Sequence, residues 1–337
     1  MRQMLFDLCG ATGVTGLERE AARLAAEYLA PLCDAVRVDP LGSVLGSKAG
    51  EGAHILLEAH LDQIGLVVTG AEDGGFLRAA PCGGVDRRLL CGQEVTVHGT
   101  EDFFGVIPAS APHLAEKDSE KALPATALLI DTGLTRAEAE RKAPAGSRVR
   151  FRTPPVALGE HRVTAPALDD RAGICALLRC MELLQGQRHA PVTVLFAVQE
   201  ETGGAGAQAA AYGLQPAQAL VVDVSFAQAP GVPATLAQGK LGGGVMVGFA
   251  PVLDQGMSER LCALAEQSDI AFTREIMGGR SYTDADKIQT TGSGVPCALL
   301  SIPLRNMHSA VETLDLRDVE ATAQLLAAYI IEKGAAA

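Results

Sequence analysis

Residues 174–198 read ICALLRCMELLQGQRHAPVTVLFAV and join a helix pattern directly to a strand pattern. In residues 174–184 the apolar side chains recur at the spacing of one helix face. Residues 191–198 form an almost continuous apolar run of the length of a buried strand. A helix followed by a fully buried strand is typical of an α/β protein whose sheet is covered by helices on both faces.

The same alternation continues on both sides of this segment. Further apolar runs of strand length stand at 54–59, 219–224 and 297–303. Helix patterns cover 17–30, 258–270 and 315–333. The last of these begins near Asp315, with Asp318 in the register of a capping box. The predicted fold class is therefore α/β, with a mostly parallel, doubly wound sheet.

The pattern changes between about residue 67 and residue 161. Short β-like pieces alternate there with Gly, Pro and charged residues; they are LLCGQEVTVHG (89–99), FFGVIP (103–108) and SRVRF (147–151). We predict a small β-barrel-like domain at 67–161, inserted into an α/β domain made of 1–66 and 162–337. Two polar stretches within it, 113–126 and 135–147, are predicted to be loops.

Composition excludes several classes of protein. The chain has 337 residues, of which 48% are hydrophobic, so a sizeable core is expected. Its 28 basic and 40 acidic residues give a net charge of −12 without a basic stripe, which argues against a nucleic-acid partner. No apolar run approaches 18 residues, so no membrane span is expected. Asp7 interrupts the first apolar stretch, and eight scattered Cys form no CxxC pair, which indicates a cytoplasmic protein with reduced thiols.

Acidic or imidazole side chains stand at the carboxyl ends of the predicted strands or open a helix. They are His60 and Asp62, Asp169 and Asp170, Glu200 and Glu201, Asp223, and His308. Because the carboxyl ends of parallel strands meet at one edge of a sheet, we expect a common site there.

Taken alone, several of these residues have a structural explanation. The pair Asp169–Asp170 suits the N-cap of a helix. His60 is compatible with a core histidine whose hydrogen bonds are satisfied, and His308 is compatible with a histidine in a loop. Asp223 is a buried acid that needs a partner.

Two features favour a functional site. Residues 60 and 62 point to the same side of an extended strand, so that a carboxylate follows an imidazole that it is able to orient. Glu200 and Glu201 end an apolar strand, where neighbouring carboxylates repel and are costly to desolvate unless they share a cation or a proton.

Imidazole and carboxylate ligands without thiolate suit a hydrolytic site for Zn²⁺, Co²⁺ or Mn²⁺. Two imidazoles and three carboxylates are too many for one ion and fit two ions that share a bridging carboxylate. Such a pair polarises a carbonyl and activates a water, and a Glu that binds neither ion is the natural general base.

Short motifs along nearly the whole chain resemble those of the M42 family of dinuclear-metal aminopeptidases, which includes glutamyl, deblocking and tetrahedral aminopeptidases. In chain order they are GVTGLE (13–18), DPLGS (39–43), AHLDQIG (59–65), GQEVTVHG (92–99), ALDDRAG (167–173), QEETGGAGA (199–207), the Asp of VVDVS (221–225), TDAD (283–286) and PLRNMHSAVE (303–312). The resemblance implies a metalloaminopeptidase that removes N-terminal residues from short peptides.

The resemblance also implies a role for each residue of the site. His60 and Asp223 would hold one divalent ion, Glu201 and His308 would hold the other, and Asp169 would bridge both; the ions would be Zn²⁺ or Co²⁺, with Mn²⁺ as a further candidate. Glu200 would be the general base, and Asp62 would hold His60 in the correct tautomer.

Three structural features follow from the same resemblance. A cis peptide bond is expected after Asp169. The inserted domain would contribute to subunit contacts and to access to the site. The chain would form a homo-oligomer, a dodecamer in many family members.

The chain departs from the family pattern at Gln63, in the loop TGGAGA (202–207), at Asn306 and Ala310, and in the longer segment MGGRSYTDAD (277–286). These changes affect the shape of the substrate pocket. Two alternatives stay open: another dinuclear-metal hydrolase of the deacylase or carboxypeptidase type, and a chamber-forming peptide-binding protein with little catalysis.

Overall fold

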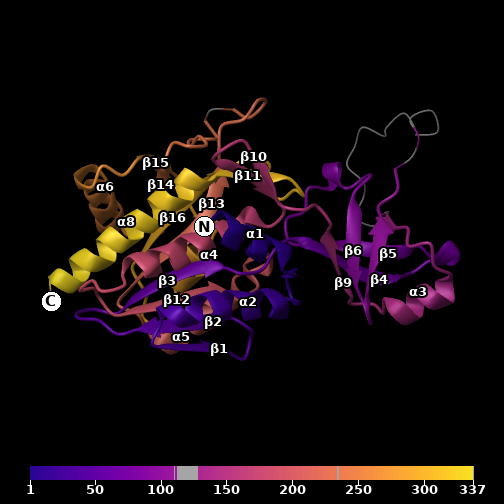
Figure 1. Cartoon of the computed structure of the whole chain (residues 1–337), viewed down its shortest axis with the longest axis horizontal. Helices are drawn as coiled ribbons and strands as arrows, with labels where there is room; N and C mark the ends of the chain where they lie inside the picture. The colour runs from indigo at the N-terminus through magenta and orange to yellow at the C-terminus, as the bar shows by residue number, and fades with distance from the viewer. Residues whose placement is uncertain (110, 112–127, 234, 337) are drawn as a thin grey trace.

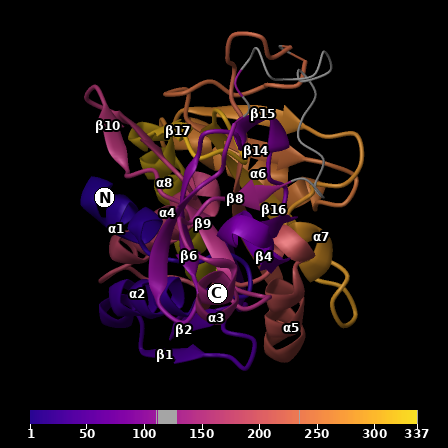
Figure 2. The same cartoon turned by 90° about the vertical axis from the view of Figure 1, so that its right-hand side faces the viewer.

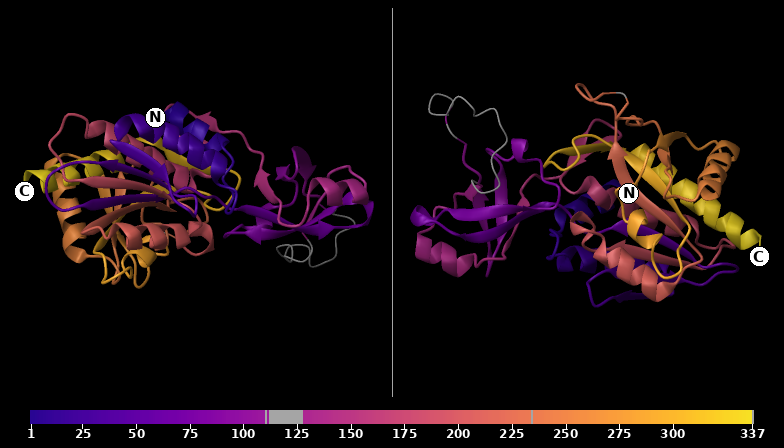
Figure 3. Two further views of the ribbon diagram at one scale, coloured as in Figure 1. Left: turned by 90° about the horizontal axis from the view of Figure 1, so that it is seen from below. Right: turned by 180° about the vertical axis from the view of Figure 1, so that it is seen from behind.

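The computed structural model describes residues 1–109, 111, 128–233 and 235–336. The chain forms a larger body, which carries the first and the last helix, and a smaller body that projects from it (Figure 1). Each body has its own sheet and its own cluster of buried apolar side chains. Figure 3 shows from two further sides that the smaller body extends away from the larger one.

An eight-stranded sheet forms the centre of the larger body. Its strand order is β1 (Ala35–Val38), β2 (Val44–Lys48), β12 (Val192–Ala197), β3 (Ile55–His60), β13 (Gln218–Phe226), β16 (Cys297–Leu304), β14 (Val245–Phe249) and β15 (Phe272–Ile276). The central strands β12, β3, β13 and β16 run parallel, as do β14 and β15. The pairs β1–β2, β2–β12 and β14–β16 are antiparallel. The predicted α/β class is confirmed.

Helices cover both faces of this sheet, as its buried apolar strands require. One face carries α1 (Arg2–Gly10), α2 (Arg19–Leu29), α4 (Leu168–Leu183), α6 (Gln255–Gln267) and α8 (Leu316–Ala335). The other face carries α5 (Ala205–Leu214) and α7 (Ala285–Ile288). Figure 2 shows α1 and α2 opposite α5 and α7. The helices predicted at 17–30, 174–184, 258–270 and 315–333 correspond to α2, α4, α6 and α8.

A six-stranded antiparallel sheet forms the smaller body. Its order is β7 (Asp102–Val106), β6 (Glu94–His98), β9 (Arg148–Phe151), β4 (Gly65–Ala71), β5 (Leu77–Cys82) and β8 (Leu129–Ile130). A bridge between Val106 and Asp131 links the two edges, so the sheet is nearly closed into the predicted barrel-like form. The domain boundaries at 67 and 161 stay a prediction.

One of the two predicted loops in this region is wrong. Residues 135–147 contain the helix α3 (Arg136–Lys142), whose capping box joins Thr135 and Glu138. The hydrophobic pattern of the sequence did not indicate this polar helix, because only one of its residues, Ala139, is buried. The other predicted loop, 113–126, lies outside the described residues.

The remaining elements are short. A three-stranded sheet joins β10 (Val156–Leu158) and β11 (Arg162–Ala165) to β17 (Glu312–Asp315) of the larger body. The 3-10 helices among the described residues are η1 (Ala30–Leu32), η2 (Asp73–Gly75), η3 (Arg87–Leu89) and η5 (Glu200–Thr202). Among the described helices, none combines the length and the apolarity needed to cross a membrane.

Candidate metal centre

The five residues predicted as metal ligands lie together at one edge of the eight-stranded sheet. They form two groups, His60 with Asp169 and Asp223, and Asp169 with Glu201 and His308. Within each group the potential ligand atoms all lie within 4.8 Å of one another. Asp169 belongs to both groups, which is the arrangement that two ions with a shared carboxylate require.

The closest approaches within the cluster involve Asp169. Its Oδ1 lies 2.8 Å from His60 Nε2, and its Oδ2 lies 3.3 Å from His308 Nε2. His60 Nε2 is also 3.9 Å from Asp223 Oδ1, and His308 Nε2 is 3.8 Å from Glu201 Oε2. The two oxygens of one carboxylate therefore face two different imidazoles.

The backbone at the start of α4 presents Asp169 to the site. The Asp169–Asp170 peptide bond is cis, as the resemblance implied, and both residues have non-helical dihedral angles. Gly173 N donates to Asp170 Oδ1, so Asp170 caps the helix while Asp169 is left free to face the imidazoles.

A carboxylate that the sequence did not single out braces this arrangement. Glu312, which is 1% exposed, accepts hydrogen bonds from two backbone N–H groups. Its Oε2 accepts from Asp169 N at 3.1 Å, and its Oε1 accepts from His308 N at 2.9 Å. Its place in the motif SAVE was the available signal, but a buried acid four residues after His308 does not by itself indicate which groups it holds.

Asp62 is fully buried and holds the loop that carries the paired Glu residues. Its Oδ1 accepts from Glu200 N at 3.0 Å, and its Oδ2 accepts from Glu201 N at 3.3 Å and from Thr15 Oγ1 at 2.7 Å. The predicted contact of its carboxylate with His60 Nδ1 is 3.7 Å long. The closer partner of Nδ1 is the Asp62 carbonyl oxygen, at 3.1 Å.

The electrostatics of the cluster fit divalent cations. Burial and the neighbouring carboxylate of Asp169 raise the pKa of Glu201 to about 8, and burial also raises the pKa of Asp223. Glu201 Oε1 is buried without a hydrogen-bond partner among the described residues. Buried carboxylates that repel one another and a spare oxygen beside two imidazoles form a donor set that suits metal ions of the zinc type.

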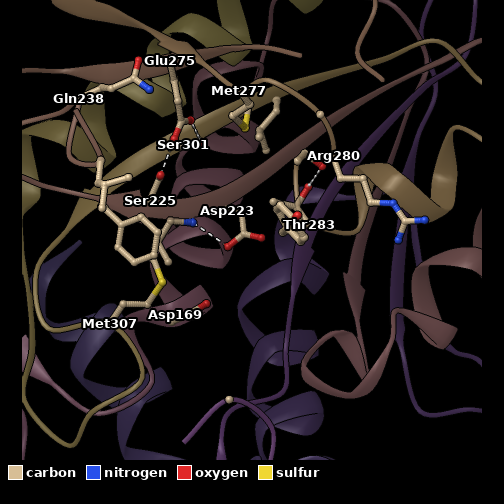
Figure 4. A pocket seen from close by; sticks show the side chains of 18 of the residues that line it. Asp169, Asp223, Ser225, Gln238, Glu275, Met277, Arg280, Thr283, Ser301 and Met307 are labelled. Carbon is tan, nitrogen blue, oxygen red and sulfur yellow. Dashed lines mark hydrogen bonds between the residues drawn. The ribbon is translucent and has the colours of Figure 1, made fainter. Parts of the chain in front are cut away.

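The cluster forms the floor of a pocket of about 930 Å³. Glu200 lines this pocket but belongs to neither ligand group. The wall beyond Asp223 is formed by Ser225, Glu275, Ser301 and Met277, and Met307 lines the pocket on the side of Asp169 (Figure 4). Residues 277–282, which begin the segment that is longer than in the family pattern, also line the pocket.

Comparisons with known proteins show which family the chain belongs to. A family model described as M42 glutamyl aminopeptidase matches residues 42–325. The chain is 31% identical to a lysyl aminopeptidase of Pyrococcus furiosus, over 98% of this chain and 96% of the relative.

Solved structures of similar proteins cover nearly the whole chain. Aminopeptidase APDkam598 from the archaeon Desulfurococcus kamchatkensis has a TM-score of 0.92 and 33% identity, over 98% of this chain and 94% of that one. The Pyrococcus horikoshii TET1 peptidase can assemble into a tetrahedron or a large octahedral shell. It has a TM-score of 0.86 and 30% identity, over 97% of this chain and 98% of that one. The chain therefore belongs to the M42 glutamyl aminopeptidase family, which is metal-dependent, and is a hydrolase that acts as an aminopeptidase.

Proposed function

We propose that the chain removes N-terminal residues from short peptides at a dinuclear metal centre, with Glu200 as the general base. The observation that carries this proposal is the pair of ligand groups that share Asp169 on the floor of the pocket, with Glu200 beside them but in neither group.

Five residues would hold the metal ions. His60 and Asp223 suit one ion, Glu201 and His308 suit the second, and Asp169 reaches both. When bound, two divalent ions supply Lewis acidity toward the scissile carbonyl and lower the pKa of a water. Zn²⁺ or Co²⁺ fits these donors best, and Mn²⁺ also fits.

In this proposal Glu200 moves the proton of the reaction. Burial raises the pKa of its carboxyl group, which makes Glu200 a better proton acceptor than an exposed Glu. Its backbone N–H is fixed by Asp62, so the side chain starts from a defined position. Glu200 accepts a proton from the attacking water and passes it to the leaving amine.

We also propose that the chain works as a cytoplasmic homo-oligomer, in a tetrahedral dodecamer. The tetrahedron formed by the P. horikoshii peptidase supports this. The inserted domain, 67–161, would provide subunit contacts and limit access to the site. Its exposed apolar side chains Leu89 and Phe104 are candidates for such contacts. Light scattering of the purified chain at micromolar concentration tests this, and a monomer mass would contradict it.

A panel of short peptides with free and with N-acetylated ends tests the catalytic proposal. Hydrolysis is measured after chelation and after Zn²⁺, Co²⁺ or Mn²⁺ is added back. Cleavage that returns with metal, and only at free N-termini, supports the proposal. Cleavage of acetylated peptides would instead indicate a deacylase or a carboxypeptidase-like enzyme. No cleavage with any metal would favour a peptide-binding protein that forms chambers.

A further inference from the structure

A buried carboxylate that is not part of the metal cluster lies in the wall of the same pocket. Glu275, in β15, is 6% exposed and is one of the residues that line the pocket. Its two oxygens accept hydrogen bonds from the hydroxyl groups of Ser225 and Ser301, the latter at 2.6 Å. Within the described part of the chain, no Lys, Arg or His forms an ion pair with it.

The two hydroxyl groups do not fully compensate the negative charge of an ionised carboxylate. A buried charge is costly unless a group of opposite charge or several hydrogen bonds compensate it. Burial raises the pKa of Glu275, and the two hydroxyl groups counteract the shift only in part. A cation that enters the pocket would supply the missing partner.

The backbone fixes the position of Glu275 relative to the metal cluster. Ser225 follows Asp223 by two residues on β13, so both side chains point to the same face of the sheet. Ser301 is the partner of Asp223 across the β13–β16 pair. The hydroxyl side chain of Ser301, which donates to Glu275, therefore stands next to Asp223 in the sheet. Figure 4 shows Glu275 and Ser225 on the side of Asp223 that faces away from Asp169.

Apolar side chains line the pocket beside this carboxylate. Phe226 and Met277 contribute to the wall, and methionine adapts well to flexible aliphatic chains. A lysine side chain has a matching form, because its apolar stem carries an ammonium group at the end. Arg280 also lines the pocket, but its guanidinium group points away from Glu275 in Figure 4.

We propose that Glu275 determines specificity by binding the cationic side chain of a lysine or arginine at the substrate's N-terminus. The inference rests on the proposed function, since it takes the neighbouring cluster as the place where the N-terminal residue is removed. It does not follow from the names of the relatives, because the family model is named for glutamyl and the P. furiosus relative for lysyl residues.

Dipeptides that differ only in the N-terminal side chain test the proposal with the metal-loaded, full-length enzyme. Lys-Ala, Arg-Ala, Glu-Ala and norleucyl-Ala are compared by kcat/KM; norleucine has the lysine stem without the charge. A hydrogen-bonded charge of this kind predicts a lysine-to-norleucine ratio of roughly ten- to a hundredfold. Glu275→Gln should reduce the ratio to about one, because an amide does not attract the ammonium group in the same way.

Two further variants make the test specific. Glu259→Gln removes one negative charge from a carboxylate outside the pocket, which pairs with exposed Arg274, and should keep the wild-type ratio. Glu275→Met is a second neutral variant in case the amide packs poorly beside the two serines. Thermal melting checks that each variant is folded.

Binding of free L-lysine and L-norleucine, measured by calorimetry, separates this inference from the proposed function. If no dipeptide is cleaved, the proposed function fails, and tighter binding of lysine that is lost in Glu275→Gln still supports the inference. Equal binding of the two amino acids would overturn it. A preference for Glu-Ala, or a lysine preference that both Glu275 variants retain, would also overturn it.

Discussion

His60 Nε2 lies 2.8 Å from Asp169 Oδ1, although the two residues are 109 positions apart in the chain. One residue ends strand β3, and the other stands at the start of α4. The second oxygen of Asp169 faces His308 Nε2 at 3.3 Å. Asp169 therefore occupies the position from which one side chain reaches both halves of the cluster.

Replacement of Asp169 by Asn should disturb both halves together. The amide offers one oxygen and one NH₂ group, so one of the two imidazoles meets a donor instead of an acceptor. We expect the chain to lose at least one metal ion per subunit and activity to fall by about a hundredfold or more. Elemental analysis and peptide hydrolysis measure the two effects. Asp102→Asn, at an exposed carboxylate beside His98, is the control. Full metal content in Asp169→Asn would rule out the bridging role.

Glu200→Gln should separate chemistry from metal binding. The amide has nearly the same shape but does not accept the proton from water, so kcat should fall by about 10²- to 10⁴-fold. Metal content should stay near that of the wild type, because Glu200 belongs to neither ligand group. If the variant keeps most of its activity, another residue is the base.

Asp62 should act by positioning the loop of Glu200 and Glu201. In Asp62→Asn, one of the two backbone N–H groups would face an NH₂ group in place of an oxygen. We expect a loss of about 10- to 100-fold in activity or metal affinity. Thr15→Val removes only the hydroxyl that donates to Asp62 and should cost about 1 kcal/mol of stability. If Thr15→Val lost more activity than Asp62→Asn, the positioning role of Asp62 would be contradicted.

Removal of the metal ions should make stability depend on pH. The pKa of Glu201 is raised from 4.5 to about 8 by burial and by Asp169, and the carboxylates of Asp169 and Glu201 raise that of His308 from 6.5 to about 9 against the effect of burial. Both folded-state values lie above the unfolded ones. The stability that each group contributes is thus complete below its unfolded pKa and is lost as the pH rises through 8 and 9.

We therefore expect the melting temperature of the chelated protein to fall between about pH 4.5 and pH 9, whereas that of the metal-loaded protein stays nearly constant. Thermal melting in matched buffers with and without chelator measures this. Because the ions displace protons from these groups, calorimetry at neutral pH should also show proton release on metal binding. A chelated protein that gains stability as the pH rises would contradict the assignment.

The gathering of the five candidate ligands could be predicted from the sequence because of where they stand. His60, Glu201, Asp223 and His308 end or follow strands of apolar residues, and parallel strands bring their carboxyl ends to one edge. Asp169 opens the helix that the pattern at 174–184 made visible. Strand and helix periodicity were thus enough to place these residues without knowledge of their contacts.

Contacts between distant segments could not be predicted in this way. Asp318 stands in capping-box register, but its carboxylate accepts from the N–H groups of Gly242 and Gly244, and Asp315 alone caps α8. The capping-box prediction is therefore wrong, because distant donors compete with the local one. Glu275 was missed for a similar reason, since its strand is only partly buried and its two hydroxyl partners come from β13 and β16.

Replacement of Glu312 tests how a contact between distant segments of the chain supports the candidate metal centre. Each of its oxygens accepts from the backbone of a different candidate ligand, Asp169 and His308. Glu312→Gln keeps one acceptor and turns an NH₂ group toward the other N–H, which leaves a buried donor unpaired at a cost of about 1–3 kcal/mol of stability.

If Glu312 acts by positioning, the loss in metal affinity should exceed what general destabilisation explains. We expect about 10- to 100-fold weaker metal binding at a temperature where the variant is still folded. Ser258→Ala, which removes a buried hydroxyl donor to Gly248 O outside the site, is a control of comparable stability loss and should bind metal normally. Metal affinity in Glu312→Gln that matches this control would show that Glu312 stabilises the fold without shaping the metal centre.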